Sequence, residues 1–170
     1  IKKVGQNIKY DFIILKKYGV ELNSVEDTML LSYTLDAGNN RHNMDTLSEL
    51  HLNHKTISYK DLVGSGKKQL KFSEVDIDKA TEYAAEDADV TLRLYEILSE
   101  RVSDEKLSQI YEAFEKPMIK ILSKLETYGI KVDDNYLKEL SKKFEKKIEK
   151  IEKEIFKISG KEFNIGSPKQ

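Results

Sequence analysis

The sequence contains no cysteine and no tryptophan, and it has only two prolines among its 170 residues. Without cysteine the chain forms no disulfides, cysteine-based zinc sites, iron–sulfur clusters or thiol nucleophiles. No apolar run approaches the roughly 20 residues that a membrane helix needs. No basic segment followed by an apolar one marks a secretory signal. These absences predict a cytoplasmic protein without a membrane partner.

Length and composition describe a polar chain of one domain, or of one domain and a fraction. Charged residues make up 35% of the sequence and hydrophobic residues 39%, a balance common in helix-rich proteins. The sequence begins at Ile1 without an initiator methionine. We therefore expect a segment of a longer protein, in which some active-site residues lie outside the segment.

Charge is unevenly distributed, although the net charge is only −1. Residues 73–105 contain 11 acidic and 3 basic side chains, whereas residues 131–170 contain 11 lysines and 8 acidic side chains. An acidic block beside basic ones is found where a metal site adjoins a phosphate-binding surface. It is more often a set of solvated helix faces of mixed sign, so charge alone does not decide the function.

Hydrophobic periodicity predicts a mostly helical chain with one or two short strands. Helices are expected at residues 7–18, 28–35, 44–52, 76–102, 105–128 and 134–159, and strands near residues 4–5 and 25–27. Residues 55–72 should form a loop. Ser103 and Asp104 should cap the next helix, in which Pro117 should produce a kink. In the last helix the apolar residues recur every three or four positions, close to a coiled-coil seam.

Carboxylates are the most informative candidates for chemistry. Tyr83 and Asp87 are four residues apart, so a helix places them on one face. Glu86 and Asp89 add negative charge that a divalent cation would relieve, since Mg²⁺ binds one or two carboxylates together with phosphate oxygens and water. Asp11 begins another helix directly after a strand. Taken singly, these residues also fit an exposed acidic helix and a helix N-terminal acid.

Several segments, in order along the chain, resemble the 3′–5′ proofreading exonuclease domain of bacterial family A DNA polymerases. Residues 4–11 (VGQNIKYD) are similar to the second exonuclease motif, and residues 83–91 (YAAEDADVT) to the third, of the Tyr-x-x-x-Asp type. Segments 27–30, 41–45 and 54–57 resemble the intervening region. Residues 115–117 and 129–133 resemble the helical entry to the polymerase domain, and residues 163–170 a segment of its thumb. This ordered set is far more specific than any single motif.

The resemblance implies catalytic and metal-binding roles for three residues. Asp87 would ligate a first metal ion, and Asp11 would help to hold a second through water. Tyr83 would orient the attacking water or hydroxide. Two Mg²⁺ ions are implied as cofactors, with Mn²⁺ or Zn²⁺ as substitutes. One ion would lower the pKa of the water, and the other would stabilise the leaving 3′ oxygen.

The same resemblance implies DNA contacts. Gln6, Asn7 and Arg41 fall where the family contacts the single-stranded 3′ end, and Tyr59 falls where an aromatic ring packs against the nucleotide. Lysine-rich thumb helices would grip the primer–template duplex through its phosphates. The parent polymerase would use dNTPs, act as a monomer and be nucleoid-associated in the cytoplasm.

The implied fold is an α/β ribonuclease H-like exonuclease without its first strands, followed by long thumb helices. Residues 1–102 would form the partial exonuclease domain, and residues 103–170 the start of the polymerase domain. The family's Asp-x-Glu motif would lie upstream of Ile1. We therefore expect this segment alone to be inactive, although its parent would both proofread and polymerise.

Two other interpretations stay open at this stage. A ribonuclease D-like 3′–5′ exonuclease acting on RNA shares the Tyr-x-x-x-Asp motif, but it should lack the thumb-like ending. A non-catalytic helical scaffold with a coiled-coil arm would need neither Asp11 nor Asp87. Replacing those two aspartates separates the scaffold from both exonucleases.

Overall fold

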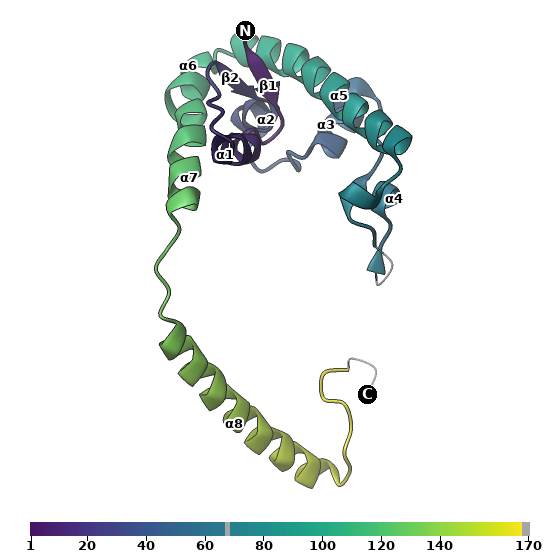
Figure 1. Cartoon of the computed structure of the whole chain (residues 1–170), viewed down its shortest axis with the longest axis vertical. Helices are drawn as coiled ribbons and strands as arrows, with labels where there is room; N and C mark the ends of the chain where they lie inside the picture. Colours follow the sequence, from purple (N-terminus) through teal and green to yellow (C-terminus); the bar gives the residue numbers. More distant parts are fainter. Residues whose placement is uncertain (67–68, 168–170) are drawn as a thin grey trace. The chain divides into compact units, whose positions relative to one another are not determined.

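The computed structural model describes residues 1–66 and 69–167. The chain divides into two compact units, Ile1–Tyr128 and Gly129–Gln170 (Figure 1). All seven predicted site residues belong to the first unit. The predicted domain boundary between residues 102 and 103 concerns the longer parent protein and stays a prediction.

The first unit is built on two short parallel strands. β1 (Lys3–Gly5) pairs with β2 (Val25–Asp27) in a register that places Lys3 opposite Val25 and Gly5 opposite Asp27. The connection contains α1 (Lys9–Lys17), as the helical pattern predicts. All three residues of β2 are buried, and α2 (Thr28–Asp36) follows directly. The carboxyl ends of both strands therefore lie at one edge, beside the starts of α1 and α2.

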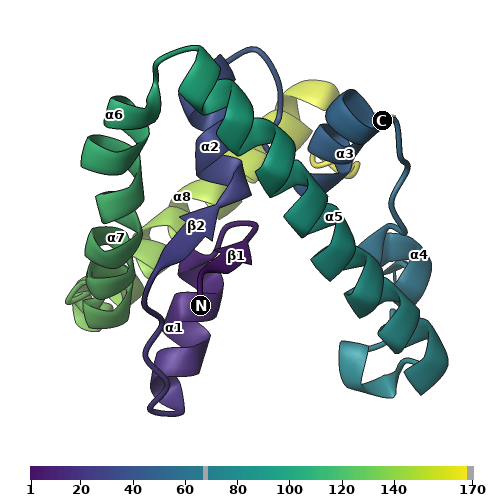
Figure 2. The ribbon, with the colours of Figure 1, turned by 90° about the horizontal axis from the view of Figure 1, so that it is seen from above.

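The 28-residue helix α5 (Ile77–Asp104) supplies most of the core. It packs against α2 and α3 (Met44–Leu52), and Figures 1 and 2 show it passing alongside both. The central core consists of fully buried leucine and valine side chains from these three helices: Leu31, Leu47, Val90, Leu94 and Leu98. Burying such side chains contributes about 1.5–3 kcal/mol each. The buried residues of α5 begin at Val90, so its C-terminal half holds the unit together.

Two predictions about local structure are wrong. Residues 55–72 are not simply a loop, because they contain α4 (Tyr59–Val63) and the start of the 3₁₀ turn η2 (Phe72–Glu74). The Ser58 hydroxyl caps α4 by accepting from the Asp61 amide at 3.1 Å, and Val63 is buried. A five-residue helix is too short to show a periodic apolar pattern, which explains why the sequence concealed it.

The second error concerns the helix after α5. Ser103 and Asp104 do not cap it, since α5 continues through Asp104 and the chain turns at Lys106, whose φ is 60°. The next helical stretch is α6 (Ser108–Ile110), then a π-helical turn, η3 (Tyr111–Glu115), then α7 (Lys116–Tyr128). The predicted interruption near Pro117 takes the form of that π-helical turn, consistent with the missing amide donor of proline.

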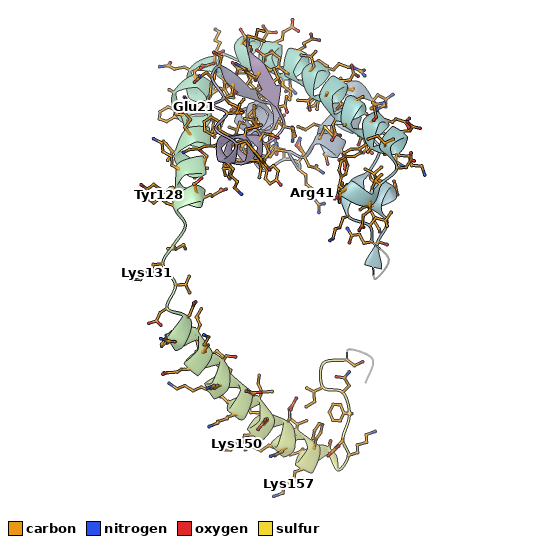
Figure 3. All side chains as sticks on the ribbon, viewed as in Figure 1. Glu21, Arg41, Tyr128, Lys131, Lys150 and Lys157 are labelled. Atoms are coloured by element: carbon orange, nitrogen blue, oxygen red, sulfur yellow. The ribbon has the colours of Figure 1, made fainter. Side chains whose placement is uncertain are left out.

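The second unit is one long helix and an irregular ending. α8 (Asp134–Ser159) begins where the Asp133 carboxylate accepts from the Tyr136 amide at 2.9 Å, and it ends at Gly160, whose φ is 70°. Five of its seven seam residues are exposed: Leu137, Phe144, Ile148, Ile151 and Ile158. Leu140 and Ile155 are partly buried. Lys150 and Lys157 extend from the same helix (Figure 3). Among the described residues, no helix is both long and apolar enough to cross a membrane.

Candidate functional site

An open cleft of about 840 Å³ lies between the strand–helix connection and α5. Its walls include four of the predicted site residues: Gln6, Asn7, Asp11 and Asp87. Asp11 is in the first turn of α1, and Asp87 is near the middle of α5. Folding thus brings the two candidate motifs to one cavity, although 75 residues separate them in the sequence (12 to 86).

Asp87 has the properties of a cation ligand. Its Oδ1 atom is buried and has no hydrogen-bond partner among the residues that the structure describes. Burial raises the pKa of Asp87, hydrogen bonding from Tyr83 lowers it, and the charges of Glu86 and Asp45 raise it, so that the net shift is upward. A buried acceptor without a donor is costly, and a bound cation would remove that cost.

Asp11 is a second acceptor on the wall of the cleft. The residue as a whole is exposed, yet packing around its carboxylate raises its pKa. Among the described residues, no group of three or more histidine, aspartate or glutamate side chains is arranged to hold a metal ion. This chain therefore offers two carboxylates, which fit a cation but do not enclose one.

Tyr83 lies one helical turn before Asp87, as its spacing predicts. Burial and the neighbouring Asp87 carboxylate raise the pKa of Tyr83 to about 12. Its hydroxyl therefore stays protonated at neutral pH and can donate a hydrogen bond. Tyr83 can orient a water molecule, but it is unsuited to act as a base.

Tyr83 also belongs to a group of three aromatic rings. Its centroid lies 6.3 Å from that of Tyr59 and 6.3 Å from that of Phe72, both in edge-to-face geometry. Phe72 was not predicted as a site residue, because residues 55–72 were expected to form a loop. The only indication in the sequence was a second aromatic residue, Phe72, 13 residues after Tyr59.

Gln6 lines the cleft, but its side-chain amide is hydrogen-bonded to other groups of the protein. Its amide nitrogen donates to the carbonyl oxygen of His42 at 2.7 Å, and its amide oxygen accepts from the Thr28 hydroxyl at 2.5 Å. Gln6 therefore holds the loop that carries Arg41. The Arg41 side chain itself is exposed and extends away from the ribbon (Figure 3).

Asn7 has a left-handed backbone with φ of 56°, a conformation that asparagine tolerates better than most residues. Just before it, Gly5 approaches Ile8 closely. A Cβ atom added to Gly5 would lie 2.8 Å from Ile8 Cγ1. The tight turn at residues 5–8 therefore sets the direction in which Asn7 faces the cleft.

Glu86 binds the segment that precedes α4, a role that the sequence did not reveal. It accepts from the Ile57 amide at 2.7 Å and pairs with His54 Nε2 at 2.8 Å. These bonds fasten the segment before α4 to the helix that carries Asp87. Asp89, in contrast, is exposed and pairs with Arg93 at 3.4 Å.

Known proteins match this chain along its whole length. A family model described as 3′–5′ exonuclease matches residues 1–103. DNA polymerase I of Rhizobium leguminosarum is 51% identical over 170 residues, covering 100% of this chain and 17% of that protein. DNA polymerase I of Pseudomonas aeruginosa is 41% identical over 172 residues, covering 99% of this chain and 19% of that protein.

A solved structure is also similar in fold. It is the POL domain of Pol1 from M. smegmatis in complex with DNA primer–template and dNTP, with a TM-score of 0.70 and 23% identity. The match covers 97% of this chain and 25% of that one.

The chain belongs to the 3′–5′ exonuclease family. It corresponds to the exonuclease region of bacterial DNA polymerases I and spans less than a fifth of the length of the two relatives named above. The resemblance found in the sequence is thereby confirmed.

Proposed function

We propose that this chain is part of a proofreading 3′–5′ exonuclease within a DNA polymerase I, which removes mismatched nucleotides from a primer 3′ end. The observation that carries the proposal is the buried Asp87 Oδ1 atom, which has no hydrogen-bond partner among the described residues. It lies near Tyr83, in a cleft that Asp11 also lines. In the parent protein, a complete α/β ribonuclease H-like fold would surround this cleft.

The two aspartates are suited to hold Mg²⁺, with Mn²⁺ or Zn²⁺ as substitutes. Asp87 would bind one ion directly, and Asp11 would bind a second through water. Further carboxylates outside this chain would complete the site. When bound, the ions supply an activated water and stabilise the leaving 3′ oxygen. The protonated Tyr83 hydroxyl would orient the water.

DNA binding follows from the groups around the cleft. Asn7 lines the cleft. Outside the residues that line it, the exposed Arg41 can pair with a phosphate, and the exposed ring of Tyr59 offers a face on which a base can stack. These contacts read no base edge, so the site would accept any single-stranded end. Mismatched ends melt more easily and would enter more often.

The second unit would contribute to the polymerase reaction. Its lysine-rich helix α8 would contact the phosphates of a primer–template duplex while the parent protein incorporates dNTPs. By itself the 170-residue chain would neither degrade nor extend DNA, because the two aspartates do not complete a two-metal site.

Asp87→Ala and Asp11→Ala in the full-length protein test this function. Each should lower exonuclease activity by more than about a hundredfold, since residues that merely orient metal ligands already contribute about 10–100-fold. Nucleotide incorporation should be unchanged. Asp89→Ala is the matched control on α5, and it should retain exonuclease activity. Full exonuclease activity in Asp87→Ala, or loss of synthesis alone, would contradict the proposal.

A further inference from the structure

The Tyr111 hydroxyl lies at a junction between two parts of the first unit. It donates to Glu26 Oε2 at 2.9 Å and accepts from the Asp27 amide at 3.1 Å. Tyr111 is 3% exposed, and its two partners in β2, Glu26 and Asp27, are also buried. A residue beyond the matched exonuclease segment therefore completes the hydrogen bonding of β2, inside that segment.

Asp27 carries this connection to the cleft. Its Oδ1 atom accepts from the amides of Asn7 at 3.0 Å and Met29 at 2.9 Å, and its Oδ2 atom accepts from the Ile8 amide at 2.9 Å. The same carboxylate thus caps α2 and fixes the left-handed backbone at Asn7. Movement of Asp27 would change how Asn7 faces the cleft.

The π-helical turn η3 explains how the Glu26 carboxylate can bind both Tyr111 and Lys116. Lys116 donates to Glu26 Oε1 at 2.8 Å, while Tyr111 donates to the other oxygen. Residues five apart in an α-helix point about 140° away from each other. In a π-helix they are hydrogen-bonded neighbours one turn apart. The turn at Tyr111–Glu115 therefore brings both side chains onto Glu26.

Charge strengthens the same junction. Burial works against the charge of Lys116, but its hydrogen bonds to Glu26 and Glu112 raise its pKa above the ordinary value. Lys116 is thus a cation at neutral pH and neutralises the buried Glu26 carboxylate. Hydrogen bonds to a charged group are stronger than those between neutral groups, which favours a fixed geometry at this position.

We propose that Tyr111 is a positioning residue for the exonuclease reaction: through Glu26 and Asp27 its hydroxyl sets the backbone of Asn7, and hence the grip on the DNA 3′ end. This inference rests on the proposed function of the cleft. It makes the segment that follows the exonuclease match part of the exonuclease site.

Tyr111→Phe in the full-length protein tests the inference, because it removes the hydroxyl and keeps the buried ring. The KM for a single-stranded oligonucleotide should rise by about 3–10-fold, equivalent to one hydrogen bond. The kcat and the rate of nucleotide incorporation should change less than about twofold. Tyr18→Phe, at a tyrosine that is 80% exposed, is the control and should behave as the unaltered protein.

Hydrogen exchange separates this inference from the proposed function. In Tyr111→Phe the amides of Asn7 and Ile8 should exchange faster, whereas amides of α5 should not. A lower melting temperature with unchanged KM and unchanged exchange at Asn7 would overturn the inference. If Tyr111→Phe does not fold, Lys116→Met, which removes the other donor to Glu26, should give the same pattern. If the unaltered protein has no exonuclease activity, the proposed function fails, and exchange alone decides the role of Tyr111.

Discussion

The rings of Tyr59 and Phe72 are stacked, with centroids 6.4 Å apart and planes 10° from parallel. Both rings are about half exposed and both contact Tyr83 edge-on, so Phe72 supports the ring proposed for base stacking and the tyrosine beside Asp87. Phe72 thereby joins the end of the 59–72 segment to the centre of the site.

Loss of the Phe72 ring should weaken the exonuclease. Each aromatic pair contributes about 0.5–1.5 kcal/mol, so Phe72→Ala should lower exonuclease kcat/KM by about tenfold and leave synthesis unchanged. Phe72→Tyr keeps the ring and should retain most of the activity. Steady-state hydrolysis of a labelled oligonucleotide measures both. Equal activity of Phe72→Ala and the unaltered protein would show that the stacking has no role.

Gln6 and Arg41 should act as a coupled pair. Because Gln6 holds the His42 carbonyl, Gln6→Ala should release the loop and reduce DNA binding by roughly the amount that Arg41→Ala does. The double variant should then bind about as well as Arg41→Ala alone, since residues in one network are not additive. Equilibrium binding of a single-stranded oligonucleotide at several salt concentrations tests this.

The salt dependence identifies which contact is lost. Removing one phosphate contact lowers the slope of binding against salt by about 1. We expect that change for Arg41→Ala and a change of similar size for Gln6→Ala, because Gln6 acts through the loop that carries Arg41. Gln69→Ala replaces an exposed glutamine elsewhere in the unit and should leave the slope unchanged. Additive losses in the double variant would mean that Gln6 contacts DNA itself.

Replacement of Asp27 should destabilise the first unit. Its carboxylate accepts from three backbone amides and is 1% exposed. Leaving buried donors unpaired costs about 1–3 kcal/mol, so Asp27→Ala should lower the free energy of unfolding by about 2–4 kcal/mol. Urea unfolding of the 170-residue chain measures this. The control is Asp61→Ala, at an exposed position of α4 where only a surface bond from the Ser58 hydroxyl is removed, and its loss should be smaller.

The ionised Asp87 carboxylate should lower the free energy of unfolding of the metal-free chain at neutral pH. Its pKa is higher in the folded than in the unfolded chain, so the native state holds the proton more tightly. The corresponding stability is present below the ordinary aspartate pKa of 3.8 and is lost as pH rises through the higher folded value. Metal binding and exonuclease activity should fall on acidification at a higher pH than for an unperturbed aspartate.

Asp87→Asn should therefore raise the melting temperature of the metal-free chain at pH 7. The rise should be about 1–3 °C, because partial exposure screens the charge and about 1 kcal/mol corresponds to 2–4 °C in a domain of this size. Asp89→Asn, which removes an exposed charge paired with Arg93, should give no rise. A lower melting temperature for Asp87→Asn would mean that the native state favours the ionised carboxylate.

Patterns within single elements were predictable from the sequence. The long helices α5 and α8 have clear apolar periodicity, and the motifs around Asp11 and Asp87 are local strings of residues. Contacts between distant residues were not predictable. Glu86 and His54 are 32 residues apart, and Tyr111 and Glu26 are 85 apart. Nothing in the sequence near Glu26 indicates that a tyrosine hydroxyl and a lysine converge on it.

The two incorrect expectations have the same cause. The cap predicted at Ser103-Asp104 and the loop predicted at residues 55–72 both followed from local residue preferences, which tertiary packing overrides. At Val63 the burial of one side chain, together with the Ser58 cap, stabilises a helix too short for its pattern to be recognised. Residue preferences and periodicity predict a helix best when the helix is long.

The family match ends at residue 103, whereas the first compact unit continues to Tyr128. A module excised at residue 103 would lose Tyr111 and Lys116, leaving Glu26 and the Asp27 amide without their partners inside a hydrophobic setting. A graft of this exonuclease-family region onto another protein should therefore include the residues through Tyr128. A chimera joined at the shorter limit would inherit both candidate metal ligands and yet disturb the turn at Asn7 that is proposed to contact DNA.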